Sequence, residues 1–206
     1  MIHLLITPTF WLMQLLILQL MNNVFGFFKI ILKKFFTFFL SKDIEEVYLN
    51  KAKRLGIKFG QGCRFYSTNF STEPYLIQLG DHVTITEGVR FITHDGGVWI
   101  YREEFPNIEL FGSINIGNNV FVGLNAIILL NTDIGDNCIV AAGAVVKGKF
   151  ESNSIIGGIP AKVIGSTKDY YAKNLKNFTF IRNLSPNEKK IFILNKFNKS
   201  ESCNNK

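Results

Sequence analysis

The sequence predicts an all-β fold in which short strands wind as stacked triangular coils, with helices before and after them. Three observations predict it. An apolar residue returns at every sixth position, small or corner-forming residues fill the columns between, and both ends of the chain lose this period. The apolar column is clearest at Ile116, Val122, Ile128, Ile134, Val140 and Val146. A period of six indicates a repeat fold, because each unit can bury its apolar face only against its neighbours.

The columns that follow the apolar one explain the corners. Asn or Gly stands three positions further on, where a left-handed backbone conformation turns the chain. This column holds Asn119, Asn125, Asn131, Asn137 and Gly143. His82 falls in the same column, and because His tolerates such a corner we interpret it as structural. Cys63 and Cys138 fall in the next, small column, so we expect them in the core.

Length, composition and charge limit the function classes. The chain has 206 residues, 47% hydrophobic and 19% charged, which excludes a disordered or fibrous protein. The net charge of +7 comes from Lys and Arg clustered near the two ends, so the central domain offers no nucleic-acid-binding face. Three Cys without metal-ligand spacing predict neither a disulfide framework nor a zinc site, and indicate a reduced, cytoplasmic protein.

Residues 1–40 form an apolar and basic leader. Its second part, residues 22–40, places Lys29, Lys33 and Lys34 on one side of a Phe-rich amphipathic helix. Such a helix is suited to lie in a membrane interface, here at the inner face of the cytoplasmic membrane. The alternative is a helix that caps the domain or is buried in an oligomer.

Helices are expected on both sides of the repeat. Residues 41–56 predict a short capping helix, because Asp43 and Glu46 have the spacing of a capping box and Gly56 can end the helix. Residues 166–206 predict a helical extension and a tail.

The repeat itself runs over residues 57–165, and two breaks interrupt it. A bulge of two residues falls near Glu73–Pro74, and a loop over residues 95–113 leaves the coils. Long loops on rigid scaffolds usually carry function, so this loop marks the expected site.

The repeat and three stretches of sequence resemble a known family. The stretches are EPYLIQLGDHVTITEGVRFITHDGG, AAGAVVKGKF and GGIPAKVIG. With the six-residue columns they are similar to the hexapeptide-repeat acetyltransferases, and the first is similar to the branch that O-acetylates sugars of bacterial capsule or lipopolysaccharide. The resemblance implies a left-handed parallel β-helix, a homotrimer, acetyl-CoA as donor and an active site between adjacent subunits.

The resemblance also implies a catalytic residue where the loop leaves the coils, and His94 stands there. A sugar hydroxyl must lose its proton as it attacks a thioester, and His is a base in the neutral range. A carboxylate on the other ring nitrogen would fix the tautomer. Asp95 is the nearest candidate for this role, but adjacent residues in a strand point apart, so Glu87, Glu103 and Glu104 stay open.

Acetyl-CoA is expected along the corners of the coils. Mapped from the family, its contacts are Gly123, Leu124, Ala142, Lys147, Gly148 and Lys162. Small residues let the pantetheine arm approach the backbone, and Lys162 would meet a CoA phosphate. No metal is expected, because a zinc hydratase on the same fold needs about three His ligands and the domain offers two.

These observations predict an acetyl-CoA-dependent O-acetyltransferase acting on a sugar of a surface polysaccharide or its precursor, with His94 as general base. One alternative is N-acetylation of an amino-sugar nucleotide or of a small acceptor such as serine. Another is a solenoid scaffold without catalysis. Trp99, Tyr101 and Phe105 in the loop either stack on a sugar ring or pack on a neighbouring subunit.

Overall fold

A computed structural model of the protein describes residues 45–203, with side chains described as far as residue 198. The predicted leader over residues 1–40, its membrane-facing part and Asp43 lie outside the described residues. Within residues 45–203, no helix combines the length and hydropathy that crossing a membrane requires. The chain divides into a unit that ends at Ile164 and a second unit that begins at Gly165.

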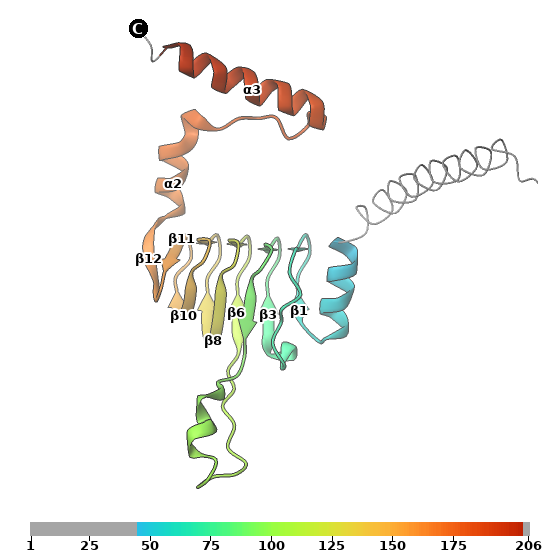
Figure 1. Cartoon of the computed structure of the whole chain (residues 1–206), viewed down its shortest axis with the longest axis vertical. Helices are drawn as coiled ribbons and strands as arrows, with labels where there is room; N and C mark the ends of the chain where they lie inside the picture. Colours follow the sequence, from blue (N-terminus) through green and yellow to red (C-terminus); the bar gives the residue numbers. More distant parts are fainter. Residues whose placement is uncertain (1–44, 204–206) are drawn as a thin grey trace, which may run out of the picture. The chain divides into compact units, whose positions relative to one another are not determined.

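Short strands, the first eleven of them paired in parallel, build the first unit (Figure 1). They are β1 (Lys58–Phe59), β2 (Arg64–Phe65), β3 (Ile77–Leu79), β4 (Thr84–Ile85), β5 (Arg90–Ile92), β6 (Ile114–Ile116), β7 (Phe121–Val122), β8 (Ile127–Ile134), β9 (Ile139–Val140), β10 (Val145–Phe150), β11 (Ser154–Gly158) and β12 (Ala161–Ser166). A helix over residues 45–54 precedes them, and Gly56, with a φ of +84°, follows that helix.

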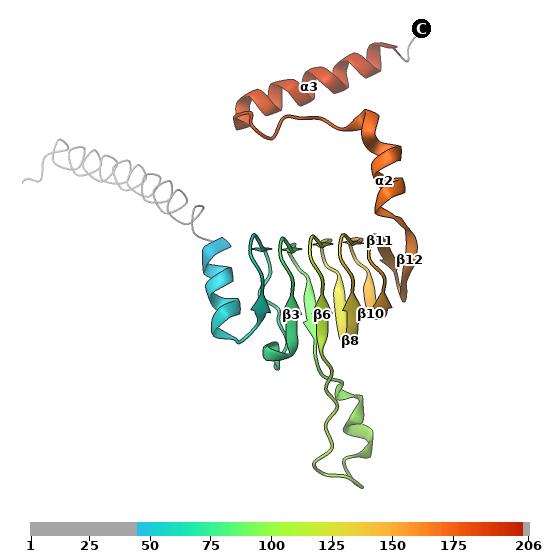
Figure 2. The same cartoon turned by 180° about the vertical axis from the view of Figure 1, so that it is seen from behind.

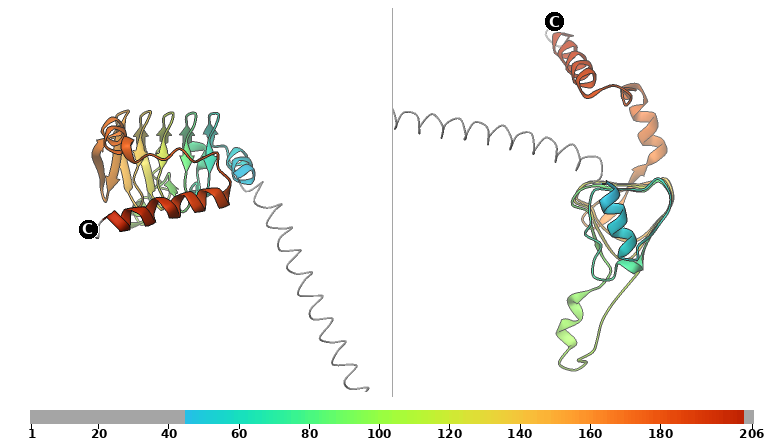
Figure 3. Two further views of the ribbon diagram at one scale, coloured as in Figure 1. Left: turned by 90° about the horizontal axis from the view of Figure 1, so that it is seen from above. Right: turned by 90° about the vertical axis from the view of Figure 1, so that its right-hand side faces the viewer.

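The strands form two sheets that enclose three faces. One sheet has the order β12-β11-β9-β7-β4-β2, and the other has the order β1-β3-β6-β8-β10, with β5 beside β8. Strand β8 bends around a corner at Asn131, so its first part pairs with β5 and its last part with β6. Seen along the stack, the coils have a triangular outline (Figure 3, right). The view from behind shows β3, β6, β8 and β10 following one another along the stack (Figure 2).

The strand register confirms the predicted period. Ile116 pairs with Ile134 and Val122 with Val140, an offset of 18 residues, or three repeats of six. In the first coil the offset is 20, and the 3-10 helix η1 (Pro74–Leu76) lies in that coil. The loop lies between β3 and β6 in the chain, and the offset between the paired residues of these two strands is 37.

The inward and corner columns are also as predicted. The six apolar residues from Ile116 to Val146 are all buried, with at most 3% of their surface exposed. The corner residues Asn119, Asn125, Asn131 and Asn137 have φ values of 54–59°, and Gly143 has a φ of 70°. At the corners after β3 and β6, an Asn or Asp side chain of one coil accepts a hydrogen bond from the backbone of the coil before it, which stabilises the stack.

Both cysteines whose side chains the structure describes are in the core. Cys63 and Cys138 are buried free thiols, and burial raises the pKa of each. His82 is a corner residue with a φ of 56°, and its Nδ1 lies 2.8 Å from Oδ1 of Asn119. The structural interpretation of these three residues is therefore confirmed.

The second unit is helical. It holds α2 (Thr167–Asn174), the 3-10 helix η3 (Leu175–Asn177) and α3 (Pro186–Cys203). Ser166 caps α2 by accepting a hydrogen bond from the backbone N–H of Asp169 at 3.0 Å. At the start of α3, the Glu188 carboxylate accepts from the backbone N–H of Ser185, which completes a capping box.

Candidate active site

The loop joins the coils through a narrow neck. His94 forms an antiparallel bridge with Phe111, and two backbone hydrogen bonds flank it, from Asp95 to Leu110 and from Gly112 to Thr93. The neck holds the base of the loop in a defined conformation. His94 is therefore the last residue of the coil and the first of the loop.

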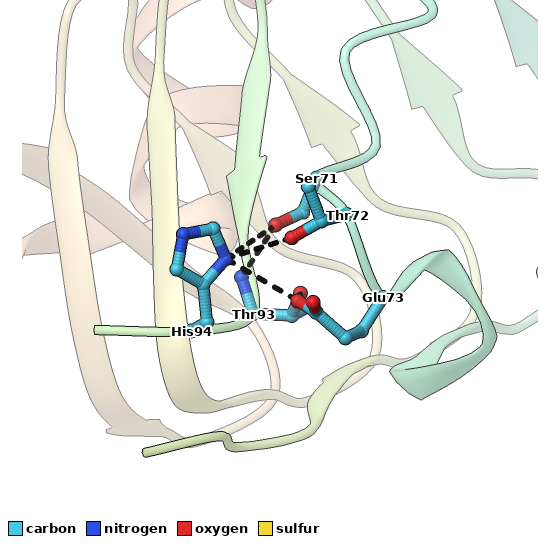
Figure 4. Close-up of polar contacts among 5 residues, drawn as sticks. All are labelled: Ser71, Thr72, Glu73, Thr93 and His94. Carbon is cyan, nitrogen blue, oxygen red and sulfur yellow. Dashed lines mark hydrogen bonds and ion pairs between the residues drawn. The ribbon is translucent and has the colours of Figure 1, made fainter. Parts of the chain in front are cut away.

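The His94 ring is held at one nitrogen by side chains of the preceding coil (Figure 4). Its Nδ1 lies 3.0 Å from Oγ1 of Thr72, 3.2 Å from Oε2 of Glu73 and 3.4 Å from Oγ of Ser71. Figure 4 shows the other ring nitrogen directed away from this cluster. No hydrogen bond joins Nε2 to any described residue, and 39% of the His94 side chain is exposed.

Glu73 is the carboxylate of this cluster, and the surrounding groups favour its charged form. Its side chain is 16% exposed. Burial raises the pKa of the Glu73 carboxyl, but hydrogen bonds from Thr72 and Thr93 and the charge of His94 outweigh burial, so the pKa lies below its ordinary value. The Thr93 hydroxyl donates to Oε2 at 2.9 Å, and the Ser71 hydroxyl accepts from the Thr93 backbone N–H at 3.1 Å.

This arrangement favours one tautomer of His94. An ionised Glu73 can only accept a hydrogen bond, and its Oε2 lies 3.2 Å from Nδ1. A proton on Nδ1 of the neutral ring satisfies this contact, and the Ser71 and Thr72 hydroxyls can accept from it as well. The Nε2 lone pair is then free to take a proton from a substrate, which is the arrangement that general-base catalysis needs.

Among the described residues, none of the carboxylates predicted as partners of His94 forms a hydrogen bond with its ring. Asp95 is not the partner of His94, because its Oδ1 accepts from the backbone N–H of Gly97 at 2.8 Å and so begins the 3-10 helix η2 (Gly96–Tyr101). Glu87 lies exposed at a coil corner, and Glu103 and Glu104 lie exposed in the loop.

Sequence reasoning missed Glu73, although a signal was present. Glu73 lies in the two-residue bulge that breaks the period of six before β3. That bulge carries Ser71, Thr72 and Glu73 to the corner at which His94 leaves the coil. A departure from a regular repeat is a place to expect function, and here the departure supplies the partners of the histidine.

The predicted donor contacts lie at three places in a single chain, two of them corners of the coils and the third Lys162 on β12. Gly123, Leu124 and Ala142 share one corner, because a Cβ on Gly123 would lie 2.6 Å from the backbone nitrogen of Ala142, and the Leu124 carbonyl accepts from Gly143. We call this corner the Gly123 edge. Lys147 and Gly148 lie at the next corner of the coil. There β10 turns from the face of the coils that contains β5 to the face that contains β6.

That second corner is the one at which His94 leaves the coils. Ile92 of β5 pairs with Leu129, and Asn131 and Gly148 turn the following coils at the same edge, with φ values of 59° and 108°. We call it the His94 edge. Lys162 is exposed on β12 at the end of the stack.

The loop presents its aromatic residues to solvent. Trp99, Tyr101 and Phe105 are 71%, 55% and 53% exposed. Arg102 ties the loop together, because its Nη2 donates to Oε1 of Glu109 at 2.7 Å and its guanidinium lies over the Trp99 ring. Within the part of the chain that the structure describes, no group of three His, Cys, Asp or Glu could hold a metal ion.

Replacing Glu73 tests its role as a positioning residue. The Glu73→Gln variant is expected to lower kcat by about 10- to 100-fold, because the amide no longer stabilises the imidazolium or fixes the ring orientation. The KM for the acyl donor is expected to stay unchanged. Glu87→Gln, at an exposed corner, is the matched control. Equal kcat values in the two variants would contradict the role.

The lowered pKa of Glu73 also predicts a pH dependence of stability. The folded-state pKa lies below the reference value of 4.5, so the charged carboxylate stabilises the folded protein above that reference. This contribution is lost as the pH falls through the folded-state pKa. The free energy of unfolding of wild type relative to Glu73→Gln, followed by urea titration from neutral to acid pH, is expected to decline over that interval. A constant difference would contradict it.

The comparisons with known proteins identify the repeat and its relatives. Residues 113–147 match the family model described as a hexapeptide repeat of succinyl-transferase. The chain is 49% identical over 169 residues to Protein CapG of Staphylococcus aureus, covering 81% of this chain and 96% of that protein. It is 32% identical over 123 residues to galactoside O-acetyltransferase of Escherichia coli (strain K12), covering 56% of this chain and 59% of that protein.

Among solved structures, a hexapeptide-repeat-containing acetyltransferase from Vibrio cholerae aligns with a TM-score of 0.47 at 25% identity, over 54% of this chain and 62% of that one. The repeat and the similarity to acetyltransferases identify an acyltransferase. The match to CapG, which spans nearly all of that protein, then gives the family: the chain belongs to the hexapeptide-repeat acetyltransferases.

Proposed function

We propose that the protein is an acetyl-CoA-dependent O-acetyltransferase that acts on a sugar of a surface polysaccharide or its precursor, with His94 as general base. One observation carries the proposal. His94 Nδ1 is held by Glu73 at 3.2 Å, and Nε2 has no partner among the described residues at the foot of an exposed loop. The similarity to a galactoside O-acetyltransferase supports a sugar hydroxyl as the acceptor.

The reaction uses both nitrogens of the ring. Nε2 takes the proton of the acceptor hydroxyl as its oxygen attacks the thioester carbonyl of acetyl-CoA. Glu73 stabilises the imidazolium that forms, through the hydrogen bond from Nδ1. The tetrahedral intermediate collapses with cleavage of the C–S bond, and Nε2 returns the proton to the thiolate. The products are an acetyl ester and free CoA.

The positions of the donor residues support a homotrimer. Gly123, Leu124 and Ala142 line one edge of the coils, and His94 lies at another edge of the same chain. One molecule of acetyl-CoA bound at the Gly123 edge of one subunit would reach the His94 edge of its neighbour, so the site is completed between subunits. Lys147 and Gly148 lie on the His94 edge and contact the donor from that side.

The finer features of the fold belong to the same proposal. We infer that the coils wind as a left-handed parallel β-helix, as the family resemblance implies. The basic Phe-rich segment over residues 22–40 brings the enzyme to the inner face of the cytoplasmic membrane, where lipid-linked glycans are assembled.

Donor binding provides a test that needs no acceptor. Isothermal titration of acetyl-CoA into the full chain is expected to show micromolar binding, and Lys162→Ala is expected to weaken it by about 3- to 10-fold through loss of a phosphate contact. Lys58→Ala, an exposed lysine at the other end of the stack, is the control. A folded protein that binds no acetyl-CoA would contradict the proposed function.

A further inference from the structure

A polar groove lies beside the cluster that holds His94. It has a volume of about 440 Å³, and its polar lining comes from Thr68, Asn69, Ser71 and Arg90. Ser71 lies between the groove and the Nδ1 side of the His94 ring, because its Oγ lies 3.4 Å from Nδ1. The groove is also lined by Ile92, the last residue of β5, two residues before His94. An acceptor whose hydroxyl reaches Nε2 must therefore pass the His94 ring to extend into this groove.

Arg90 gives the groove its charge. It lies at the exposed first position of β5, whose next residue, Phe91, points into the core. Asn69 is its bridge partner in the preceding coil, and Ile127 is its partner in the following coil. No hydrogen bond or ion pair joins its guanidinium to any residue among 45–198. Arg102, in contrast, is held by Glu109.

A second cation contacts Thr68, one of the residues that line the groove. Lys51, on the helix over residues 45–54, donates from Nζ to Oγ1 of Thr68 at 3.1 Å. No Asp or Glu lines the groove. An unpaired guanidinium, an ammonium nearby and no facing carboxylate form a site for an anion, because Arg binds phosphate and carboxylate groups with two parallel hydrogen bonds.

We propose that the groove binds an anionic group of the acceptor, a phosphate or a carboxylate, through Arg90. This inference rests on the proposed function and specifies its substrate class. The acceptor is a charged sugar, either a glycosyl phosphate or a uronic acid, and Asn69 and Thr68 supply hydrogen bonds to its hydroxyls.

The spacing along the strand agrees with such an acceptor. Arg90 precedes His94 by four residues, which corresponds to about 13 Å of extended chain. The long Arg side chain covers part of that distance. The anion is therefore not attached to the carbon that bears the reacting hydroxyl, but lies further along the sugar or on its neighbour.

The test compares charged and neutral acceptors in the full chain. Methyl glucoside, glucose 1-phosphate and methyl glucuronide, with their galactose and N-acetylhexosamine equivalents, are offered with acetyl-CoA, and CoA release is followed. Wild type is compared with Arg90→Gln and Arg90→Lys. Arg54→Gln, an exposed arginine on the helix before the coils, is the matched control.

We expect the wild type to prefer one charged series over its neutral counterpart by about 10- to 100-fold in kcat/KM. Arg90→Gln is expected to lose this preference through a higher KM, Arg90→Lys to keep part of it, and Arg54→Gln to keep all of it. The preferred series identifies the anion as phosphate or carboxylate.

Donor binding separates the two proposals. Loss of acetyl-CoA binding in the wild type would overturn the proposed function itself. Intact donor binding with equal use of neutral and charged sugars, or with a preference that Arg90→Gln retains, would overturn the anion site and leave the acetyltransferase proposal standing. Intact donor binding with transfer to none of these sugars would overturn the charged-sugar assignment.

Discussion

His94→Ala is expected to lower kcat for acetyl transfer by about 10²- to 10⁴-fold. Without the imidazole, the acceptor hydroxyl must lose its proton to water, and the departing thiolate has no positioned acid. The binding of acetyl-CoA is expected to stay unchanged, because the predicted donor contacts lie on residues other than His94. Steady-state assays of CoA release, with calorimetric titration of the donor, measure both quantities.

His82→Ala is the matched control for that experiment. His82 turns a corner of the coil, and its Nδ1 lies 2.8 Å from Oδ1 of Asn119. Its removal is expected to cost about 1 kcal/mol of stability and to leave kcat unaltered. If His94→Ala and His82→Ala had the same kcat as wild type, His94 would not be the base.

Phe65→Ala is expected to lower the free energy of unfolding by about 3–5 kcal/mol. The Phe65 side chain is fully buried, and its ring makes edge-on contacts with Phe59 and Phe70 at centroid distances of 5.1 and 5.7 Å. The substitution removes these contacts and leaves a cavity at the start of the stack, where neighbouring coils are close-packed. Urea denaturation followed by circular dichroism measures the loss.

Phe121→Ala is the control for the cavity. Phe121 lies on β7 in the same sheet as Phe65, but it points outward and is 45% exposed. Its replacement is expected to change the free energy of unfolding by less than about 1 kcal/mol. A similar loss in both variants would contradict the inward and outward assignment of the columns.

Much of the fold could be predicted because each coil repeats the same inward apolar positions and the same corner residues. Apolar residues at every sixth position must face inward, and Asn at a left-handed corner has few substitutes. The register of Ile116 with Ile134 and the positive φ of Asn131 follow from these two requirements. The conformation of the loop did not follow, because Asp95 and Arg102 organise it through contacts that have no period.

The site was predictable only in part. His94 could be found because it stands where the period stops. Its carboxylate could not be found by proximity in sequence, since Glu73 reaches His94 from the preceding coil, 21 residues earlier in the chain. Arg90 also carried no signal in the sequence, where it occupies an ordinary outward position. Its proposed role depends on the groove beside Ser71, which the structure shows and the sequence does not.

The product of the wild-type enzyme tests the central claim most directly. The full chain is incubated with acetyl-CoA and the sugar panel, and the acetylated product is followed by mass spectrometry before and after mild alkali. We expect an acetyl group that alkali removes, as an ester at a hydroxyl would be, and that is absent when His94 is replaced by Ala. An alkali-stable amide, or transfer that persists undiminished without His94, would contradict it.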